Sequence, residues 1–405
     1  MSDVEIRDLY AASYLRPLVV SLILLVTACG PGTPSDRAST LGATPAASSS
    51  QQAADFPVYA FANISAEPVS QERAEELRAA LVEASQRLGG AGMSATVLSP
   101  AGTWSGAVGK ADSSRPLGVN DQFAIASVTK TLQAAQVMKL VEGGRLRLDD
   151  PAQKYLPADL NFDTNDATIR QLMGMRSGLP DYWPAIEPLV ASDRQRVWTT
   201  SDLLAQVPAG RTPAGTTHEY ADTNYLLLQQ VIEKLTGRTV VQAMRDGGVL
   251  DIDGIERLVY QPDERPSAPM ALPNAMSPAE WEKGGGYLPS IASATGYNQF
   301  ATNSLSLAHW WQALCSGKLV SQDSLTTMAT FVDDYGLGMF PIADPYTSFG
   351  HLGADIGFIA SAGCLPDSGS VVVALSNTGV KDAAMMLPLV EAAESEAGTG
   401  TGTKP

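Results

Sequence analysis

Ser127 and Lys130 form the first pair of residues whose types and spacing could do chemistry. They open an apolar run with a helical pattern, within Phe123-Ala-Ile-Ala-Ser127-Val-Thr-Lys130. On a helix, positions i and i+3 share a face, so the Lys130 amine would come within hydrogen-bond reach of the Ser127 hydroxyl. A weak hydroxyl beside a group that can take its proton is the minimum for an activated nucleophile. A single Ser-x-x-Lys is also what chance gives in a chain of this length, so the pair needs support from elsewhere.

Two further motifs follow this pair along the chain. The first is Tyr220-Ala-Asp222-Thr-Asn224, which stands just before a predicted helix. The second is His351-Leu352-Gly353, which leads into a predicted strand near the C-terminus. A phenol, a carboxylate and an imidazole are groups that can move or stabilise protons near a nucleophile.

With these three motifs in this order, the chain resembles the serine β-lactamase and penicillin-binding protein superfamily. The similarity is greatest to its branch of class C β-lactamases, D-alanyl-D-alanine carboxypeptidases and related esterases. Further segments carry the resemblance over about residues 70–395: 141–151 (VEGGRLRLDDP), 168–173 (TIRQLM), 177–179 (SGL) and 225–228 (YLLL). It implies an α+β, β-lactamase/transpeptidase-like fold, in which N- and C-terminal segments build one antiparallel sheet flanked by helices, with a mostly helical region inserted.

The resemblance also implies a role for each motif. Ser127 would attack an acyl carbonyl and form an acyl-enzyme, Lys130 would ease its deprotonation, and Tyr220 would be the general base. The backbone N–H groups of Ser127 and Ala354 would stabilise the oxyanion. Asp222, His351, Leu352 and Gly353 would line the substrate site, with His351 in the place of the cation of the third motif.

Two residues depart from the family pattern. Asp222 stands where the family usually has Asn, and a carboxylate can only accept hydrogen bonds. A charged Asp222 would also favour the protonated form of Lys130, so that acid–base work would rest more on Tyr220. Leu352 stands where a Thr commonly helps to hold the substrate carboxylate. Leu352 cannot do this, which argues against efficient β-lactam or D-Ala-D-Ala hydrolysis and towards an esterase or amidase with an apolar leaving side.

The elements that must position these residues can be read from the apolar pattern. We predict a helix over 70–88 capped by Ser70, strands over 93–100 and 103–110, and a helix over 127–142. Helices also follow over 168–175, 223–236 and 304–314. Strands over 347–351, 356–364 and 369–376 precede a closing helix over 380–395. The strands lie at both ends of this region, which is what a single sheet closed by the two chain ends requires.

The N-terminal segment predicts export. Residues 17–28 are apolar but too short to span a membrane, which suits a signal peptide over 1–28. Val26-Thr-Ala-Cys29 resembles the bacterial lipobox, so we expect lipidation at Cys29 and a place on the outer face of the cytoplasmic membrane or in the periplasm. Residues 29–69 have the composition of a flexible tether, and 396–405 that of a disordered tail.

Charge and composition narrow the partners. The net charge is -16 and no basic cluster is visible, which excludes nucleic acid as an expected partner. The three histidines have no metal-ligand spacing, and we expect neither a metal nor a cofactor. We expect a monomer acting on a small acyl, peptide or β-lactam substrate. In an exported domain, Cys315 and Cys364 could form a disulfide or remain buried thiols, and the sequence favours neither.

The leading hypothesis is therefore a lipid-anchored serine hydrolase of the cell envelope. Within it, an esterase or amidase ranks ahead of a cell-wall carboxypeptidase, and a class C type β-lactamase comes third. The alternative from another class is a catalytically silent peptidoglycan- or penicillin-binding lipoprotein, which Asp222 and Leu352 motivate. The physiological substrate depends on loops such as 180–215 and 255–300, whose sequences do not name it.

Overall fold

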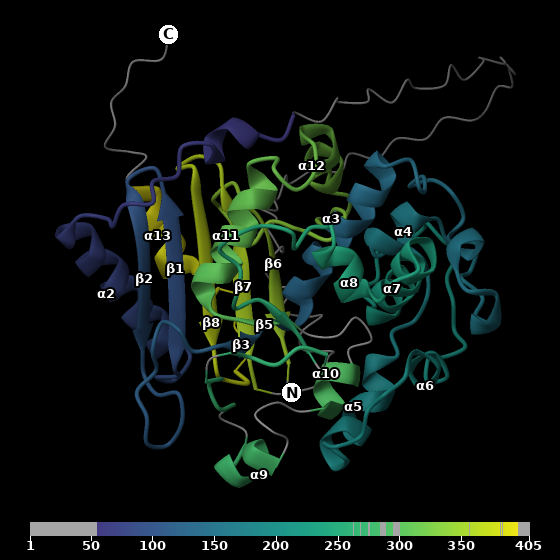
Figure 1. Ribbon diagram of the computed structural model, residues 1–405, viewed down its shortest axis with the longest axis horizontal. Coiled ribbons are helices and arrows are strands. Elements are labelled where there is room, and N and C mark those ends of the chain that lie inside the picture. Colours follow the sequence, from purple (N-terminus) through teal and green to yellow (C-terminus); the bar gives the residue numbers. More distant parts are fainter. Residues whose placement is uncertain are drawn as a thin grey trace, which may run out of the picture.

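The computed structural model describes residues 55–261, 263–267, 269–273, 276–283, 289–294, 300–355, 357–380, 382 and 384–395. Its main feature is a five-stranded antiparallel sheet with the order β2-β1-β8-β7-β6 (Figure 1). The strands are β1 (Met93–Ser99), β2 (Gly102–Val108), β6 (Phe349–Ala354), β7 (Ile359–Leu365) and β8 (Ser370–Ser376). Because β1 pairs with β8, the two ends of the folded region close the sheet, as predicted.

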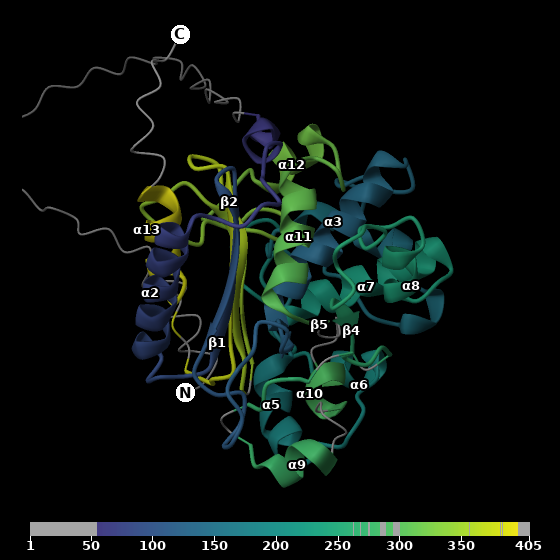
Figure 2. The same ribbon diagram turned by 60° about the vertical axis from the view of Figure 1, so that its left-hand side comes forward.

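Helices cover both faces of this sheet (Figure 2). On one face lie α2 (Gln71–Arg87) and α13 (Leu387–Ser395), and on the other lies α11 (Ser304–Cys315). The Ser70 side chain accepts from the Arg73 N–H and caps α2, as its sequence pattern predicts. The sheet strands β7 and β8 are buried along their whole length, in keeping with their mostly apolar sequences and the helices on both faces.

The remaining helices form the inserted region beyond α11. They are α3 (Thr129–Glu142), α4 (Ile169–Met173), α5 (Trp183–Ser192), α6 (Thr200–Leu204), α7 (Asp222–Thr236), α8 (Val240–Arg245), α9 (Pro278–Lys283), α10 (Pro289–Ala294) and α12 (Gln322–Met328). Short 3₁₀ turns are η1 (Val58–Phe61), η2 (Ala126–Val128), η3 (Ala152–Tyr155) and η4 (Ala158–Leu160). A small sheet of β3 (Phe123–Ala124), β5 (Phe300–Thr302) and β4 (Val259–Tyr260) joins this region to the nucleophile turn.

The structure corrects several predicted boundaries. The strand predicted over 347–351 is β6 (Phe349–Ala354), so the third motif lies inside a strand and does not lead into one. Residues 55–69 were expected in a tether, but Phe56 and Phe61 are buried and pack into the core, because two aromatic rings gain more by burial than the polar composition suggests. The helix predicted from 127 begins as the 3₁₀ turn η2 and becomes α-helical only at Thr129. The closing helix begins at Leu387 and not at 380. The signal peptide, Cys29 and the predicted C-terminal tail lie outside the described residues.

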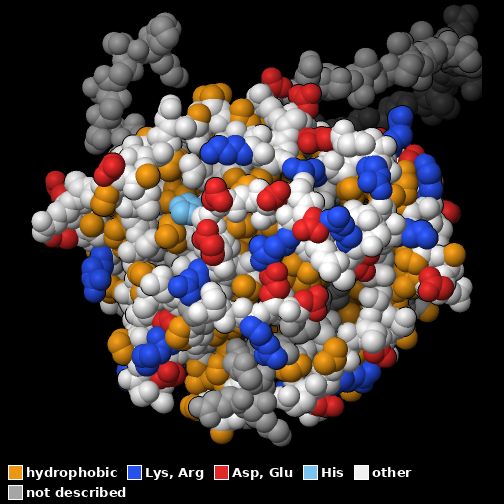
Figure 3. All heavy atoms as spheres, viewed as in Figure 1, with side chains coloured by type: hydrophobic (Ala, Val, Ile, Leu, Met, Phe, Trp, Pro, Cys, Tyr) orange, Lys and Arg blue, Asp and Glu red, His pale blue; other side chains and the backbone are white. Residues whose placement is uncertain are grey.

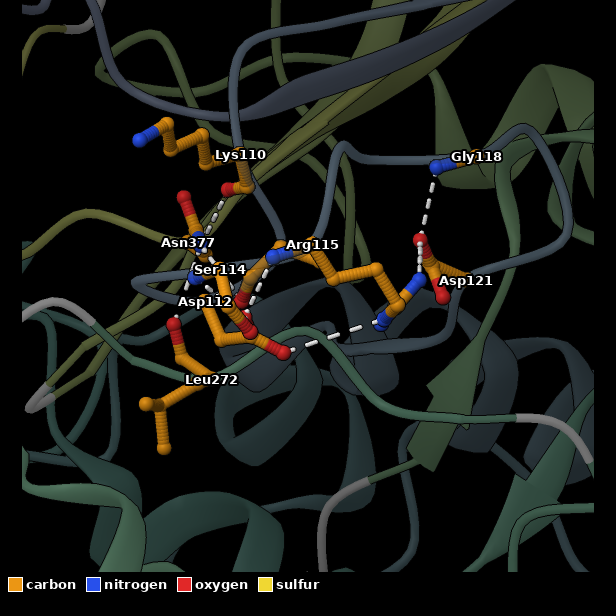
Figure 4. A network of polar contacts seen from close by, with 9 residues as sticks. Lys110, Asp112, Ser114, Arg115, Gly118, Asp121, Leu272 and Asn377 are labelled. Atoms are coloured by element: carbon orange, nitrogen blue, oxygen red, sulfur yellow. Dashed lines mark hydrogen bonds and ion pairs between the residues drawn. The ribbon is translucent and has the colours of Figure 1, made fainter.

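A polar network holds the loop between β2 and β3 (Figure 4). Asp121, which is only 3% exposed, accepts a hydrogen bond from Arg115 at 2.8 Å. Asn377, directly after β8, donates to the carbonyl oxygens of Lys110 at 3.1 Å and Leu272 at 2.9 Å. These contacts tie the last central strand to the loop that leads into β3, and so to the segment that carries Ser127.

The structure also shows the state of two cysteines and the distribution of charged side chains on one face of the molecule. Cys315 at the end of α11 and Cys364 on β7 are joined in a disulfide, which was one of the two predicted alternatives. On the face shown in Figure 3, acidic and basic side chains are interspersed. Within the described ranges, no helix is both long and apolar enough to cross a membrane.

Candidate active site

Ser127 lies in the tight turn η2, between β3 and α3. The Ile125 N–H donates to the Phe300 carbonyl at 2.9 Å, which ties the turn to the small sheet. Ala126, directly before the serine, has φ 45°, a left-handed conformation that side chains other than glycine rarely adopt. Such backbone strain is found mostly at functional sites, where the surrounding structure holds it in place. The strained turn presents a half-buried serine among buried neighbours.

Lys130 connects the other polar groups of the site. Its side chain is completely buried, and its Nζ donates to Ser127 Oγ at 2.8 Å, so the contact predicted from the i, i+3 spacing is present. The same Nζ lies 2.7 Å from Asp222 Oδ1 and 4.9 Å from the centre of the Tyr220 ring. One ammonium group thus contacts the serine, the carboxylate and the phenol ring, which come from two segments of the chain, 127–130 and 220–222.

Asp222 is the first residue of α7, where a carboxylate is favoured by the helix dipole. Its N–H donates to Asp181 Oδ1 at 3.1 Å, which fixes the start of the helix. Asn224, the amide two residues later, is buried elsewhere and accepts from the Ser177 hydroxyl at 2.5 Å. Asp222, and not Asn224, therefore faces Lys130. An opposite charge at this distance favours the ammonium form of Lys130.

Strand β6 is the edge of the main sheet and runs beside the serine turn. Gly350 exchanges two backbone hydrogen bonds with Phe340, at 2.9 and 3.0 Å, on the side of β6 away from β7. Residues two apart in a strand direct their backbone groups to the same side, so those of Leu352 and Ala354 also point outward. The predicted oxyanion donor Ala354 therefore has its N–H on the open edge of the sheet.

Gly353 owes its identity to close packing against the serine turn. A Cβ at this position would lie 2.1 Å from the Ile125 carbonyl oxygen and 3.1 Å from the Ser127 nitrogen. Any side chain would push β6 away from η2, so glycine keeps the strand edge within reach of the nucleophile. The glycine of the third motif thus acts through backbone approach and offers no side chain to a substrate.

His351 departs from its predicted role as a cation. It is completely buried among Tyr220, Tyr335 and Phe340, with ring centres 6.4, 6.0 and 4.9 Å away. Burial, together with the positive charge of Lys130, lowers the pKa of His351 to about 3. The imidazole is therefore neutral at physiological pH and cannot attract a substrate carboxylate by charge. The motif position alone did not reveal this, because the charge of a histidine depends on its surroundings.

This buried neutral histidine predicts how stability depends on pH. The unfolded chain binds a proton at His351 below about pH 6.5, whereas the folded chain does so only near pH 3, so acid favours unfolding. We expect the unfolding free energy of the wild type to fall by about 2 kcal/mol more than that of His351→Phe between about pH 7 and pH 5. Urea unfolding at both pH values measures it, and equal pH slopes for the two proteins would contradict it.

Leu352 lies on the other face of β6. Side chains alternate along a strand, so Leu352 points opposite to His351 and pairs with Ser361 of β7. The Ser361 hydroxyl is buried and has no hydrogen-bond partner among the residues that the structure describes. The side chains of His351 and Leu352 thus lie on opposite faces of β6. At the open edge of the strand, the third motif offers backbone groups and not side chains.

Tyr335 is a site residue that the sequence reasoning missed. Its hydroxyl lies 3.1 Å from His351 Nε2, and its ring packs edge-on against Tyr220, with 6.0 Å between centres. The available signal was the pair of glycines that follows: a Cβ on Gly336 would lie 2.0 Å from a backbone oxygen, and one on Gly338 would lie 2.4 Å from the Ala134 Cβ. The two glycines thus mark a segment packed tightly between the end of α12, at Gly336, and α3, at Gly338.

The other two histidines lie away from the reacting groups. His218 packs on the ring of Tyr335, with 5.5 Å between centres, and burial holds its pKa below the ordinary value. His309 Nδ1 is 3.0 Å from the Gly254 carbonyl, a structural contact. In the part of the chain that the structure describes, no three His, Cys, Asp or Glu side chains are arranged to hold a metal ion.

A family model described as beta-lactamase matches residues 77–394. Among curated proteins, the chain is 28% identical over 135 residues to a D-aminopeptidase of Cereibacter sphaeroides (strain ATCC 17023), covering 33% of this chain and 24% of the relative. It is 29% identical over 153 residues to penicillin-binding protein 4* of Bacillus subtilis (strain 168), covering 36% and 32%. The matched segments thus span about a quarter to a third of these relatives.

Solved structures share the fold over a larger part of the chain. A D-stereospecific amidohydrolase from Streptomyces sp. superposes with a TM-score of 0.60 at 24% identity, covering 80% of this chain and 99% of that one. D-amino acid amidase from Ochrobactrum anthropi SV3 superposes with a TM-score of 0.64 at 21% identity, covering 79% and 98%. At these identities the likeness establishes the α+β architecture, in agreement with the predicted fold class.

Proposed function

The chain belongs to the beta-lactamase family, and from that premise we propose that it is a serine hydrolase that cleaves amides through an acyl-enzyme. The observation that carries the proposal is the position of the Lys130 ammonium, 2.8 Å from Ser127 Oγ and 2.7 Å from Asp222 Oδ1. Names among the relatives and structural neighbours, which include a D-aminopeptidase and a D-amino acid amidase, favour an amide over a β-lactam.

In the proposed mechanism, Ser127 Oγ attacks the acyl carbon while its proton passes to Tyr220, the general base. Lys130 remains an ammonium because Asp222 balances its charge. Its Nζ faces the Tyr220 ring and stabilises the phenolate form of that residue. The backbone N–H groups of Ser127 and Ala354 hold the oxyanion. Tyr220 then returns the proton to the leaving amine as the C–N bond breaks, and activates a water that releases the acid.

The polar groups of the site favour a substrate without a carboxylate beside the scissile bond. Lys130 is already paired with Asp222, and His351 is neutral. Leu352 has no hydroxyl with which to hold a carboxylate. An amide or ester with a neutral leaving side therefore suits the site better than a D-Ala-D-Ala peptide or a penicillin.

Covalent labelling tests the proposal. A fluorophosphonate probe is expected to label the wild type and Ser316→Ala, which changes a serine at the C-terminal end of α11, and to leave Ser127→Ala unlabelled. Turnover of amino-acid amides and short acyl esters, without turnover of nitrocefin or D-Ala-D-Ala peptides, would support the amidase hypothesis. If the wild type forms no adduct, the alternative of a catalytically silent peptidoglycan- or penicillin-binding protein is favoured. The observation that supports this alternative is the ion pair between Asp222 and Lys130.

Leu352→Thr tests the substrate preference directly. The new hydroxyl would stand beside the edge of β6, where it could donate to a substrate carboxylate while it accepts a hydrogen bond from the buried Ser361 hydroxyl across the strands. We expect kcat/KM on substrates with a free carboxylate to rise about tenfold relative to a neutral amide. Leu352→Val, which has the same branched shape without the hydroxyl, is the control. An equal gain in both variants would show that the side-chain volume, and not the missing hydroxyl, limits these substrates.

We further infer that the protein is exported and lipid-anchored through Cys29, a proposal supported by the sequence of residues 17–29. Cell fractionation of the wild type and Cys29→Ala tests it. The wild type is expected in the membrane fraction and the variant in the soluble fraction or medium. Membrane association of both proteins would refute lipidation at Cys29.

A further inference from the structure

Tyr335 contacts the catalytic groups from a segment that none of the three motifs includes. It is 5% exposed and stacks on Phe340, with 5.7 Å between ring centres. Backbone hydrogen bonds between Val332 and Tyr335 close the turn before it, in which Asp333 and Asp334 have φ 53° and 62°. An ion pair between Asp333 and Arg176 ties this turn to the loop after α4. Tyr335 is therefore held in place from both sides.

The direction of the hydrogen bonds around His351 follows from the acceptors. His351 Nδ1 lies 2.5 Å from the carbonyl oxygen of Leu352, which can only accept, so Nδ1 carries the proton. The neutral ring then has an unprotonated Nε2, which can only accept. The Tyr335 hydroxyl, 3.1 Å from Nε2, must be the donor of that bond. The proton positions thus form one chain, from Tyr335 through His351 to the Leu352 carbonyl.

This hydrogen-bonded chain ends at the Leu352 carbonyl, on the open edge of β6. The Leu352 backbone groups point away from β7, to the side where Gly350 bonds with Phe340. An extended substrate lying along this open edge would place its own N–H opposite the Leu352 carbonyl. A carbonyl oxygen has two lone pairs, so it can accept from His351 and from a substrate together. Hydrogen bonds in such a chain polarise and strengthen one another.

We propose that Tyr335 is a positioning residue for the reaction: its hydroxyl, the His351 ring and the Leu352 carbonyl form one hydrogen-bonded chain that fixes the substrate edge of β6 and backs the ring of Tyr220. The proposal rests on the proposed hydrolase function. It gives the neutral histidine of the third motif a task that needs no charge. It also explains how Tyr220 keeps its place over Lys130, since both Tyr335 and His351 pack against its ring.

Histidine NMR tests the chain without any substrate. The protein has three histidines, so a ¹⁵N-edited spectrum of their rings can be assigned with His218→Gln and His309→Gln variants. We expect His351 to be protonated at Nδ1 and to keep that state from about pH 5 to pH 8. In Tyr335→Phe the Nε2 signal should move towards that of a nitrogen without a hydrogen bond. An Nε2-protonated ring, or an Nε2 signal unchanged in Tyr335→Phe, would overturn the chain.

A double-mutant cycle tests the positioning role. Tyr335→Phe and His351→Phe are each expected to lower kcat on an amino-acid amide about tenfold with little change in KM, since each breaks the chain at one hydrogen bond or more. The double variant should be no slower than the slower single variant, because the chain is already broken. Tyr260→Phe, which removes another buried tyrosine hydroxyl, is the matched control.

The kinetic results can contradict the positioning role of Tyr335 in two ways. Effects that multiply in the double variant, or a Tyr335→Phe effect no larger than that of Tyr260→Phe, would overturn the positioning role. If the wild type hydrolyses no amide and takes no fluorophosphonate label, the hydrolase function fails and the positioning role fails with it. The NMR result then still shows whether the hydrogen-bonded chain exists.

Discussion

Lys130→Met is expected to slow acylation of Ser127 by about 10²–10⁴-fold, the usual contribution of a group that assists proton transfer at a nucleophile. The reason is geometric, because this one ammonium lies 2.8 Å from the serine oxygen and 4.9 Å from the centre of the Tyr220 ring. Its loss removes both the hydrogen bond to Ser127 and the charge that stabilises the Tyr220 phenolate. Stopped-flow measurement of the nitrophenol released from a short acyl nitrophenyl ester, as Ser127 is acylated, gives the rate constant.

The same substitution is expected to destabilise the fold. Asp222 keeps only 12% of its side chain exposed, and without Lys130 its charge would be left nearly buried and unpaired, which costs about 3–5 kcal/mol. Lys130→Met combined with Asp222→Leu replaces the ion pair with apolar groups, and we expect it to recover most of the stability but none of the rate. This double variant separates catalysis from folding.

Lys139→Met is the matched control, because Lys139 lies in the last turn of the same helix α3, whereas Ser127 directly precedes its first turn. It is expected to leave the acylation rate within about twofold of the wild type, because the half-buried Lys139 lies at the opposite end of the helix from the serine. An acylation rate in Lys130→Met equal to that of Lys139→Met would remove Lys130 from the mechanism. Tyr220 would then have to work without it.

The second large effect is expected from the disulfide. Cys315 and Cys364 are 49 residues apart in sequence, and their bond ties α11 to β7, the strand next to the substrate edge β6. Closing a loop of this length restricts the unfolded chain and is expected to contribute about 4 kcal/mol. Urea unfolding of Cys315→Ala/Cys364→Ala against the wild type measures the loss.

Reduction provides the control for this experiment. Dithiothreitol should lower the unfolding midpoint of the wild type and leave that of the double variant unchanged, since the variant has no bond to reduce. Both sulfur atoms are completely buried, so reduction is expected to require denaturant. An equal midpoint for oxidised wild type and double variant would show that the bond contributes nothing to stability.

Much of the architecture follows from local patterns that the structure reproduces. The cap at Ser70, the strand pair after it and the helix that begins beside Asp222 all depend on neighbours within a few residues. The Ser127–Lys130 contact belongs to the same class, because three residues of helix bring the two side chains onto one face. The start of the folded region was placed too late, because two buried aromatic rings lie in a stretch of otherwise polar composition.

By itself, the sequence determined the nucleophile pair, the family and the order of the elements, since each rests on spacing along the chain. The tertiary structure alone decided the charge of His351 and the place of Tyr335. Burial and the nearness of Lys130 keep His351 neutral, and both depend on segments more than 100 residues apart in sequence. A motif names the groups at a site, but their charges and hydrogen bonds depend on which distant side chains the fold packs around them.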